Sequence, residues 1–233
     1  MRVSWLLGAV VALGLSTAGN AASITILPTG DRGPPAGYVP DATFDSVPAQ
    51  AYGSTSPSGS FVQGGVAFSG TGVVMNNGGQ GSLGLYASPL GDTTNYMAVL
   101  GGGSEEIAYS SFNTSFGLYW GSVDTYNSLA FYSGSVLVAT ITGADLPLSA
   151  NGGQTDYASN AYVWITALPQ FDRVFAASSS NAFEFDNIVA GSATTSFSAA
   201  VPEPSTWAML LFGFVGLGYA AFRRSKTPIS AVA

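Results

Sequence analysis

Residues 116–120 read Phe116-Gly-Leu-Tyr-Trp120, and this short stretch indicates which kind of fold the chain adopts. Successive side chains of an extended strand point to opposite faces, so Phe116, Leu118 and Trp120 share one face. Leu129 and Phe131 repeat the same spacing in the next apolar run. Large apolar side chains on a single face are typical of a strand that packs against a core. The stretch therefore predicts a β-sheet with one buried face.

Short apolar or alternating runs of this kind recur along the chain at intervals of roughly ten residues. No stretch of ten or more residues shows a capped apolar period of 3.6 residues, which excludes a helix-rich domain. Together the runs predict an all-β fold, an antiparallel, jelly-roll-like β-sandwich with hairpins. The expected strands span residues 61–68, 72–75, 82–87, 96–100, 105–109, 115–120, 128–132, 136–141, 161–167, 173–177 and 182–189, and the turn clusters between them are Asn76–Gly79, Gly101–Ser104, Tyr132–Ser135 and Asn151–Gly153.

The composition of the 233 residues excludes several classes of function. Six basic residues stand against thirteen acidic ones, for a net charge of -7, and binding to a phosphate backbone needs clustered Lys and Arg. We therefore expect no nucleic-acid partner. The chain contains neither Cys nor His, which excludes disulfides, thiolate or imidazole metal sites and a Ser-His-Asp triad.

The N-terminus has the pattern of a secretory signal peptide. Arg2 precedes an apolar run from Trp5 to Leu15, and small residues follow it. We expect signal peptidase to cleave after Ala21, with Ala22 as the alternative. The mature chain would then be exported.

The C-terminus predicts one transmembrane helix over residues 206–222, a stretch without charge. Seventeen residues at about 1.5 Å rise each are long enough to span a bilayer. Arg223, Arg224 and Lys226 follow as the stop-transfer signal, and the positive-inside rule leaves residues 227–233 as a cytoplasmic tail.

The segment in front of this helix carries a family resemblance. Val201, Pro202, Glu203 and Pro204, an apolar helix and a terminal Arg cluster together resemble a PEP-CTERM sorting signal, here residues 202–226. Such tails are also catalogued as the C-terminal domain of "ice-binding" proteins, a label that says nothing about the body. The resemblance implies recognition by an exosortase, a membrane-embedded protease or transpeptidase of Gram-negative bacteria that make exopolysaccharide. The helix is then removed on delivery to the surface; a permanent membrane anchor is the alternative.

Between the two ends we expect a linker or edge strand at 22–40, the sandwich at 41–192 and a linker at 193–201. The order of motifs in this body resembles a recurring ectodomain of exosortase-dependent surface proteins, over roughly residues 40 to 190. The quoted motifs are 115–127, 142–143, 162–165 and 183–188. This family has no assigned activity, so the resemblance implies a surface protein and no catalytic residue.

Acidic residues near both ends of the sandwich suggest a structural calcium ion. Secreted sandwiches often join their terminal strands through an ion held by Asp side chains and carbonyl groups. The candidate ligands are Asp41, Asp45, Asp186 and Asn187. Ordinary solvated acids are the alternative interpretation, and the sequence requires no cofactor.

Four tyrosines and three glutamates are candidates for a glycan-binding or glycan-cleaving site. Tyr119, Tyr126, Tyr132 and Tyr162 alternate with core positions and would stack on sugar rings if an outer face were open. The adjacent Glu105 and Glu106 point to opposite faces of a strand and cannot form a glycosidase pair. Glu184, between Phe183 and Phe185, faces away from their core side, on a face expected to be wet.

The sequence and its resemblance to PEP-CTERM tails together imply an exported, exosortase-sorted protein without catalytic activity. It passes through the inner membrane of a Gram-negative bacterium and reaches the cell surface or extracellular matrix, in association with exopolysaccharide. The alternative is a carbohydrate-binding module displayed at the surface, and a third interpretation is a glycan hydrolase, which two convergent carboxylates in a cleft would favour.

Overall fold

The computed structural model describes residues 22–51, 53–76 and 85–192. The chain divides into two units, 1–193 and 194–233, and every described residue belongs to the first. The expected signal peptide, the linker at 193–201, the transmembrane helix and the cytoplasmic tail lie outside the described residues. Within the described part of the chain, no helix has the length and apolar character needed to cross a bilayer.

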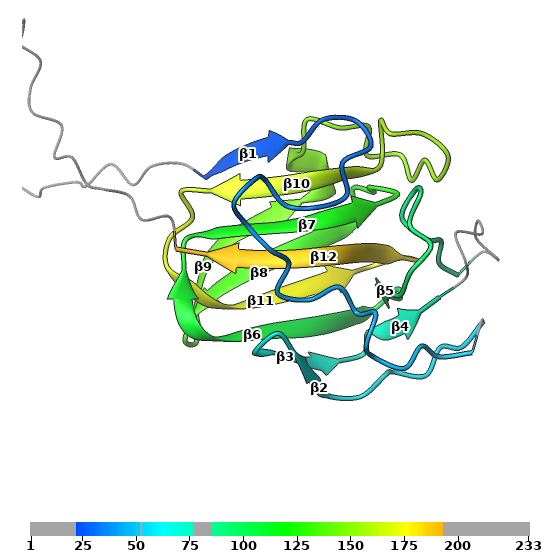
Figure 1. The fold of residues 1–233 in the computed structure, drawn as a ribbon, viewed down its shortest axis with the longest axis horizontal. Coiled ribbons are helices and arrows are strands. Elements are labelled where there is room, and N and C mark those ends of the chain that lie inside the picture. The colour runs from blue at the N-terminus through cyan, green and yellow to red at the C-terminus, as the bar shows by residue number, and fades with distance from the viewer. Residues whose placement is uncertain (1–21, 52, 77–84, 193–233) are drawn as a thin grey trace, which may run out of the picture. The chain divides into compact units, whose positions relative to one another are not determined.

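The described residues form two six-stranded antiparallel sheets that pack as a sandwich (Figure 1). The predicted all-β sandwich is confirmed. In spatial order, the front sheet contains β1 (Ser23–Ile26), β10 (Ala161–Thr166), β7 (Ser115–Gly121), β12 (Phe183–Gly191), β5 (Tyr96–Val99) and β4 (Val73–Met75). The back sheet contains β2 (Phe61–Gln63), β3 (Val66–Gly70), β6 (Gly103–Asn113), β11 (Phe171–Ser178), β8 (Asn127–Ser133) and β9 (Val136–Thr142), which a 3-10 turn, Gly143–Asp145, follows.

The core lies between the sheets and contains the side chains that the alternation predicted. Phe116, Leu118 and Trp120 of β7 are buried there, and so are Phe183 and Phe185 of β12. The rings of Trp120 and Phe183 stack at a centroid distance of 4.4 Å. The predicted register of both strands is therefore correct.

Some strands and turns differ from the expectation. The run 61–68 is a hairpin of two short strands, because Gly64 and Gly65 both have positive φ and turn the chain. The turn at 132–135 joins β8 to β9 as a hairpin. The turn at 101–104 instead carries the chain from the front sheet to the back sheet, since β5 and β6 belong to different sheets. Residues 85–87 form no strand. β1 is an edge strand, which is one of the two alternatives expected for residues 22–40.

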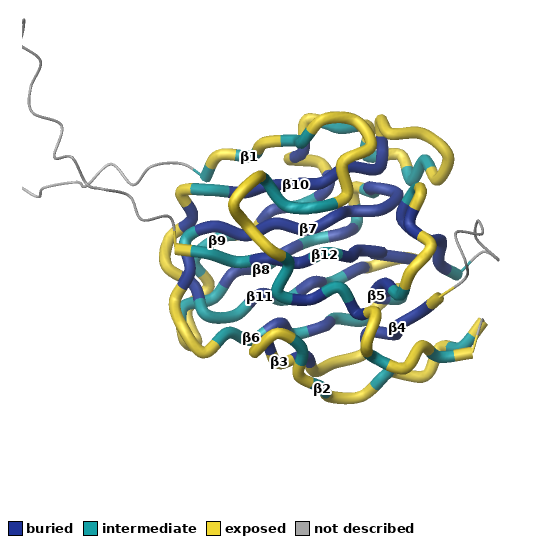
Figure 2. Tube along the Cα trace, viewed as in Figure 1, coloured by how far each residue is buried: buried dark blue, intermediate teal, exposed yellow. Residues whose placement is uncertain are grey.

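Residues 27–50, here called the strap, cross the outer face of the front sheet (Figure 1). The Leu27 N–H donates to Tyr162 O, and Ala42 forms an antiparallel bridge with Ile188. The Tyr38 ring lies 4.7 Å from that of Trp164. The strap therefore buries side chains on both faces of the front sheet, as the dark tube in Figure 2 shows for β7, β10 and β12.

All of these strands, the strap and the core lie within residues 22–192. Every strand pairing of the described residues joins two members of this segment. Residues 1–193 form one compact unit, and its part from 22 to 192 contains every described strand pairing of the sandwich, so we expect this segment to fold by itself.

Candidate functional site

Strand β12 places two carboxylates, Glu184 and Asp186, on the outer face of the front sheet. Glu184 is nevertheless only 2% exposed. The expectation of a wet face at Glu184 is wrong, although its orientation away from the core is right. The residues that follow position 85 run over this part of β12, and their backbone supplies a hydrogen bond to Glu184. Alternation predicts which way a side chain points, but not which loop covers it.

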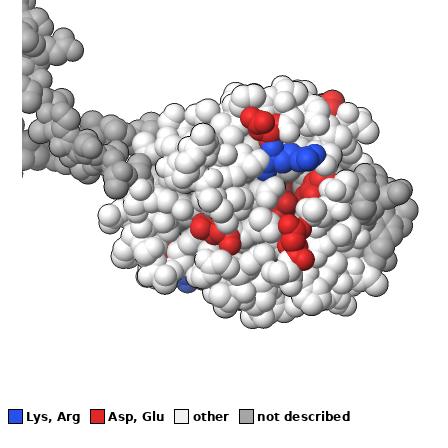
Figure 3. All heavy atoms as spheres, in the orientation of Figure 1, with Lys and Arg blue, Asp and Glu red and all other residues white. Residues whose placement is uncertain are grey.

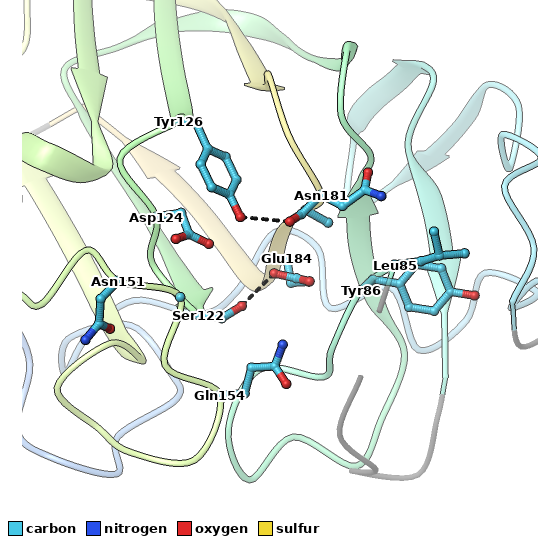
Figure 4. A pocket seen from close by; sticks show the side chains of 11 residues that line it. Leu85, Tyr86, Ser122, Asp124, Tyr126, Asn151, Gln154, Asn181 and Glu184 are labelled. Atoms are coloured by element: carbon cyan, nitrogen blue, oxygen red, sulfur yellow. Dashed lines mark hydrogen bonds between the residues drawn. The ribbon is translucent and has the colours of Figure 1, made fainter. Parts of the chain in front are cut away.

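A polar pocket of about 280 Å³ opens beside Glu184 (Figure 4). Its wall comes from four parts of the chain that are distant in sequence. They are the start of β12, the turn after β7, the loop before β10 and the segment at 85–86. The lining residues are Leu85, Tyr86, Ser122, Asp124, Tyr126, Asn151, Gly152, Gln154, Asn181, Ala182 and Glu184.

Two donors hold the carboxylate of Glu184 in the pocket wall. The Ala87 N–H donates to Oε1 at 2.8 Å, and the Ser122 hydroxyl donates to Oε2 at 2.7 Å. Burial raises the pKa of Glu184 to about 7, and the two hydrogen bonds limit this rise. The charge of Asp124 raises the pKa further. Near neutral pH, Glu184 therefore takes up and releases its proton.

Asp124 and Tyr126 form the opposite side of the pocket (Figure 4). The Tyr126 hydroxyl donates to Asn181 O at 2.7 Å. Burial raises the pKa of Asp124, and burial together with Asp124 raises that of Tyr126. Gly152 has a φ of 69°, and a Cβ atom there would lie 2.9 Å from the Asp124 carboxylate oxygens. Glycine thus leaves room for this carboxylate to reach the pocket.

The structure separates the four tyrosines proposed for glycan stacking. Tyr119 and Tyr162 are fully buried beneath the covering segments, and their hydroxyls donate to Leu90 O and Asn187 O. Tyr132 lies on the outer face of the back sheet, where its ring meets Phe175 edge to face. Of the four, Tyr126 alone lines the pocket among the described residues.

Sequence reasoning missed most of the pocket. Asp124 begins a turn in which the Asn127 N–H donates to Asp124 O, and Asp is a common turn residue with no further role. Gln154 and Asn151 lie in a Gly-rich loop with no regular pattern. The turn Asp124-Thr-Tyr-Asn127 directly after a core strand was the available signal, because strand ends commonly present functional side chains.

Glu105 and Glu106 lie on opposite faces of β6, as expected. Glu105 is buried and accepts the Gly72 N–H at 2.9 Å, and burial raises its pKa to about 7. Glu106 pairs with Arg173 at 3.3 Å on the outer face of the back sheet. The two carboxylates therefore do not act as a pair.

The residues proposed as calcium ligands are only partly brought together. Asp41 accepts the Ala190 N–H, and the Asn187 side chain donates to Arg32 O, so these two have structural partners. Asp45 and Asp186 lie near enough for the charge of Asp45 to raise the pKa of Asp186, which burial raises more. Asp92, which was not proposed, acts on Asp186 more strongly than Asp45. Among the described residues, no group of three or more His, Cys, Asp or Glu side chains is arranged to hold a metal.

The proposed sorting residues Val201 to Pro204 and the stop-transfer residues Arg223, Arg224 and Lys226 lie outside the described residues. The family model of the PEP-CTERM protein-sorting motif matches residues 200–225. No curated protein and no solved structure is significantly similar to the chain. The motif indicates export and exosortase sorting to the bacterial surface. The chain therefore carries a PEP-CTERM protein-sorting motif at residues 200–225.

Proposed function

We propose that this protein binds a glycan of the exopolysaccharide layer in the polar pocket and catalyses no reaction on it. The observation that supports this is the pocket itself, which presents side-chain amides, hydroxyls and carboxylates within about 280 Å³. Small-molecule sites commonly measure about 300–1,000 Å³, so this pocket suits one sugar residue of a chain. Asn151, Gln154 and Asn181 line the pocket and are exposed to solvent. The rest of a polymer can therefore stay outside the pocket.

The lining indicates which sugar fits. Asp124 and Glu184 line the pocket, and none of its described lining residues is Lys or Arg. A uronic acid or a sulfated sugar would bring a further negative charge beside these two carboxylates, which is unfavourable. The hydroxyl groups of a neutral sugar, or the ammonium group of an amino sugar, instead donate hydrogen bonds to carboxylate and amide oxygens. We infer that the ligand is a neutral or amino sugar.

Binding of oligosaccharides to residues 22–192 tests this proposal. A glycan array followed by titration calorimetry should find neutral or amino-sugar chains as ligands. Asp124→Asn should weaken binding at least tenfold because the amide loses charge-assisted hydrogen bonds. Asp31→Asn removes the same charge at an exposed position outside the pocket and should leave affinity unchanged. Equal binding of uronic-acid chains, or unchanged affinity in Asp124→Asn, would contradict the proposal.

Glycan hydrolysis is the second candidate, and one observation favours it: Asp124 and Glu184 line the same pocket. A glycosidase uses two carboxyl groups, of which the acid has a raised pKa. Both oxygens of Glu184 are, however, already bound by Ala87 and Ser122, which favours a structural role. Reducing ends released from a bound oligosaccharide, and lost in both Asp124→Asn and Glu184→Gln, would establish hydrolysis.

A further inference from the structure

The polar pocket contains two carboxyl groups and no basic side chain of the described part of the chain. Asp124 and Glu184 both line it (Figure 4). The described residues include two cations, Arg32 and Arg173, and neither lines the pocket. Arg32 donates to a backbone carbonyl, and Arg173 pairs with Glu106 on the back sheet. Figure 3 shows a similar imbalance on one face of the molecule, where acidic groups outnumber basic ones. A positively charged ligand would therefore meet carboxylates in the pocket without competition from these two arginines.

The backbone holds one wall of the pocket in an unusual conformation. Ser122 has a φ of 37°, a left-handed value that few residues other than glycine adopt. Its N–H donates to Asn160 Oδ1 at 2.9 Å, and its hydroxyl donates to Glu184. Residues held in such conformations are concentrated at functional sites. A carboxylate accepts about four hydrogen bonds, so the donors from Ala87 and Ser122 do not exhaust Glu184.

The opposite wall brings a second carboxylate and an aromatic ring. Asp124 has room there because residue 152 is glycine, and a Cβ atom at that position would lie 2.9 Å from both carboxylate oxygens. Tyr126 lines the same wall, and the face of an aromatic ring attracts a cation. Two carboxylates and a tyrosine ring are together the groups that bind an ammonium ion.

A neutral sugar would leave these carboxylates without a countercharge. Its entry displaces water from Asp124 and Glu184, and a negative charge that loses water without gaining a partner is strongly unfavourable. An ammonium group replaces the lost water with charge-assisted hydrogen bonds, which are roughly twice as strong as neutral ones. The pocket therefore favours a sugar that carries a positive charge.

We propose that the pocket selects a hexosamine residue with a free ammonium group over its N-acetylated or uncharged counterpart. This inference rests on the proposed function and narrows its ligand from neutral or amino sugars to amino sugars. The ammonium group donates to Asp124 and Glu184, and the neighbouring sugar residues leave the pocket past Asn151, Gln154 and Asn181, which are exposed.

Titration calorimetry on residues 22–192 tests the selection with two probes. One is an N-acetylglucosamine tetramer, and the other is the same tetramer with one residue deacetylated. A single amine keeps the general attraction between a polycation and an acidic protein out of the comparison. The deacetylated probe should bind at least about tenfold more tightly. Asp124→Asn should reduce this preference to less than about threefold, and urea unfolding shows whether the variant is folded. Asp31→Asn, at an exposed position outside the pocket, should keep the full preference.

Proton exchange in the same titrations gives a second measurement, obtained from binding enthalpies in buffers of different ionisation enthalpy. An ammonium group favours the ionised form of Glu184, whose pKa is about 7, so binding at pH 6 should release a proton. An amino group with a pKa of about 8 stays charged at this pH. An uncharged sugar favours protonated Glu184 and would cause proton uptake. The other titratable groups that line the pocket are Asp124, Tyr126 and Tyr86, and Glu184→Gln should reduce the release because Asp124 alone then supplies it.

Equal affinity for the two probes, or proton uptake with the deacetylated one, would overturn this inference and leave the proposed function in place. An equal loss of preference in Asp31→Asn and Asp124→Asn would overturn it as well, because the overall charge of the chain and not the pocket would then select the amine. Failure of both probes and of every chain on the glycan array would overturn the proposed function together with the inference.

Discussion

The buried carboxyl of Glu184 should make the stability of the sandwich fall as the pH rises, and Glu184→Gln should remove that part of the fall. The folded pKa is about 7 against an ordinary value of 4.5, so the folded state holds this proton more tightly than the unfolded state. The resulting stability is fully present below pH 4.5 and is lost as the pH rises through 7. Each pKa unit corresponds to about 1.4 kcal/mol, which gives a loss on the order of 2–3 kcal/mol between pH 5 and pH 8.

The glutamine side chain has the same shape and does not titrate in this range. Its carbonyl oxygen can still accept the Ala87 N–H, and the Ser122 hydroxyl can reverse its direction to accept from the new amide. The variant should therefore fold, and its stability should depend less steeply on pH. Other buried acids, Glu105 among them, titrate in both proteins, so the difference between the two curves isolates Glu184.

Urea unfolding followed by tryptophan fluorescence, at intervals from pH 5 to pH 8.5, measures both curves. The wild type should lose about 2–3 kcal/mol more than Glu184→Gln over this range, or roughly 5–10 °C in Tm. Thr140→Ala is the control, because Thr140 is exposed on β9 and does not titrate. Its curve should run parallel to that of the wild type. Parallel curves for wild type and Glu184→Gln would refute the reasoning.

Three further outcomes are expected. Phe183→Ala and Phe185→Ala should each cost about 3–5 kcal/mol in urea unfolding, since both side chains are fully buried in the core; losses below about 1 kcal/mol would mean that the core is packed differently. In a host with exosortase, mass spectrometry of the surface protein should find residues 207–226 absent, and an intact tail would contradict processing. Gly152→Ala and Gly102→Ala both place alanine at positive φ and should each lower the free energy of unfolding by about 1–2 kcal/mol. Only Gly152→Ala crowds the Asp124 carboxylate in the pocket. Only this variant should therefore also weaken glycan binding in calorimetry.

The interior of the sandwich could be predicted from the sequence because alternation is a local signal. Phe116 to Trp120 and Phe183 to Phe185 each show which side chains share a face, and the structure buries both sets. The hairpin at Tyr132–Ser135 was predictable for a similar reason, since Gly134 supplies the positive φ of its turn.

The outer face of the front sheet could not be predicted in the same way. The strap has no apolar period, and isolated contacts such as the Ala42–Ile188 bridge fix its path. Asp92 follows Gly91 in a stretch that looks like a surface turn, and it becomes buried only because that turn lies near β12. Alternation therefore gave the orientation of Glu184 correctly and its environment incorrectly.

The position of β12 in the front sheet has a consequence for export. A chain that crosses the membrane from its N-terminus delivers the strap early and β12 last. Yet β12 lies between β7 and β5, and the strap bonds to β10, β12 and β4. Neither the sheet nor its cover can be completed until Gly191 has been translocated, nine residues before the sorting motif begins at 200. Contacts this distant in sequence also form slowly. The exported chain must therefore stay unfolded and protected from proteolysis until the sorting motif itself arrives at the membrane. Folding of the sandwich and recognition of the motif by exosortase then take place at the same time, and each can affect the other.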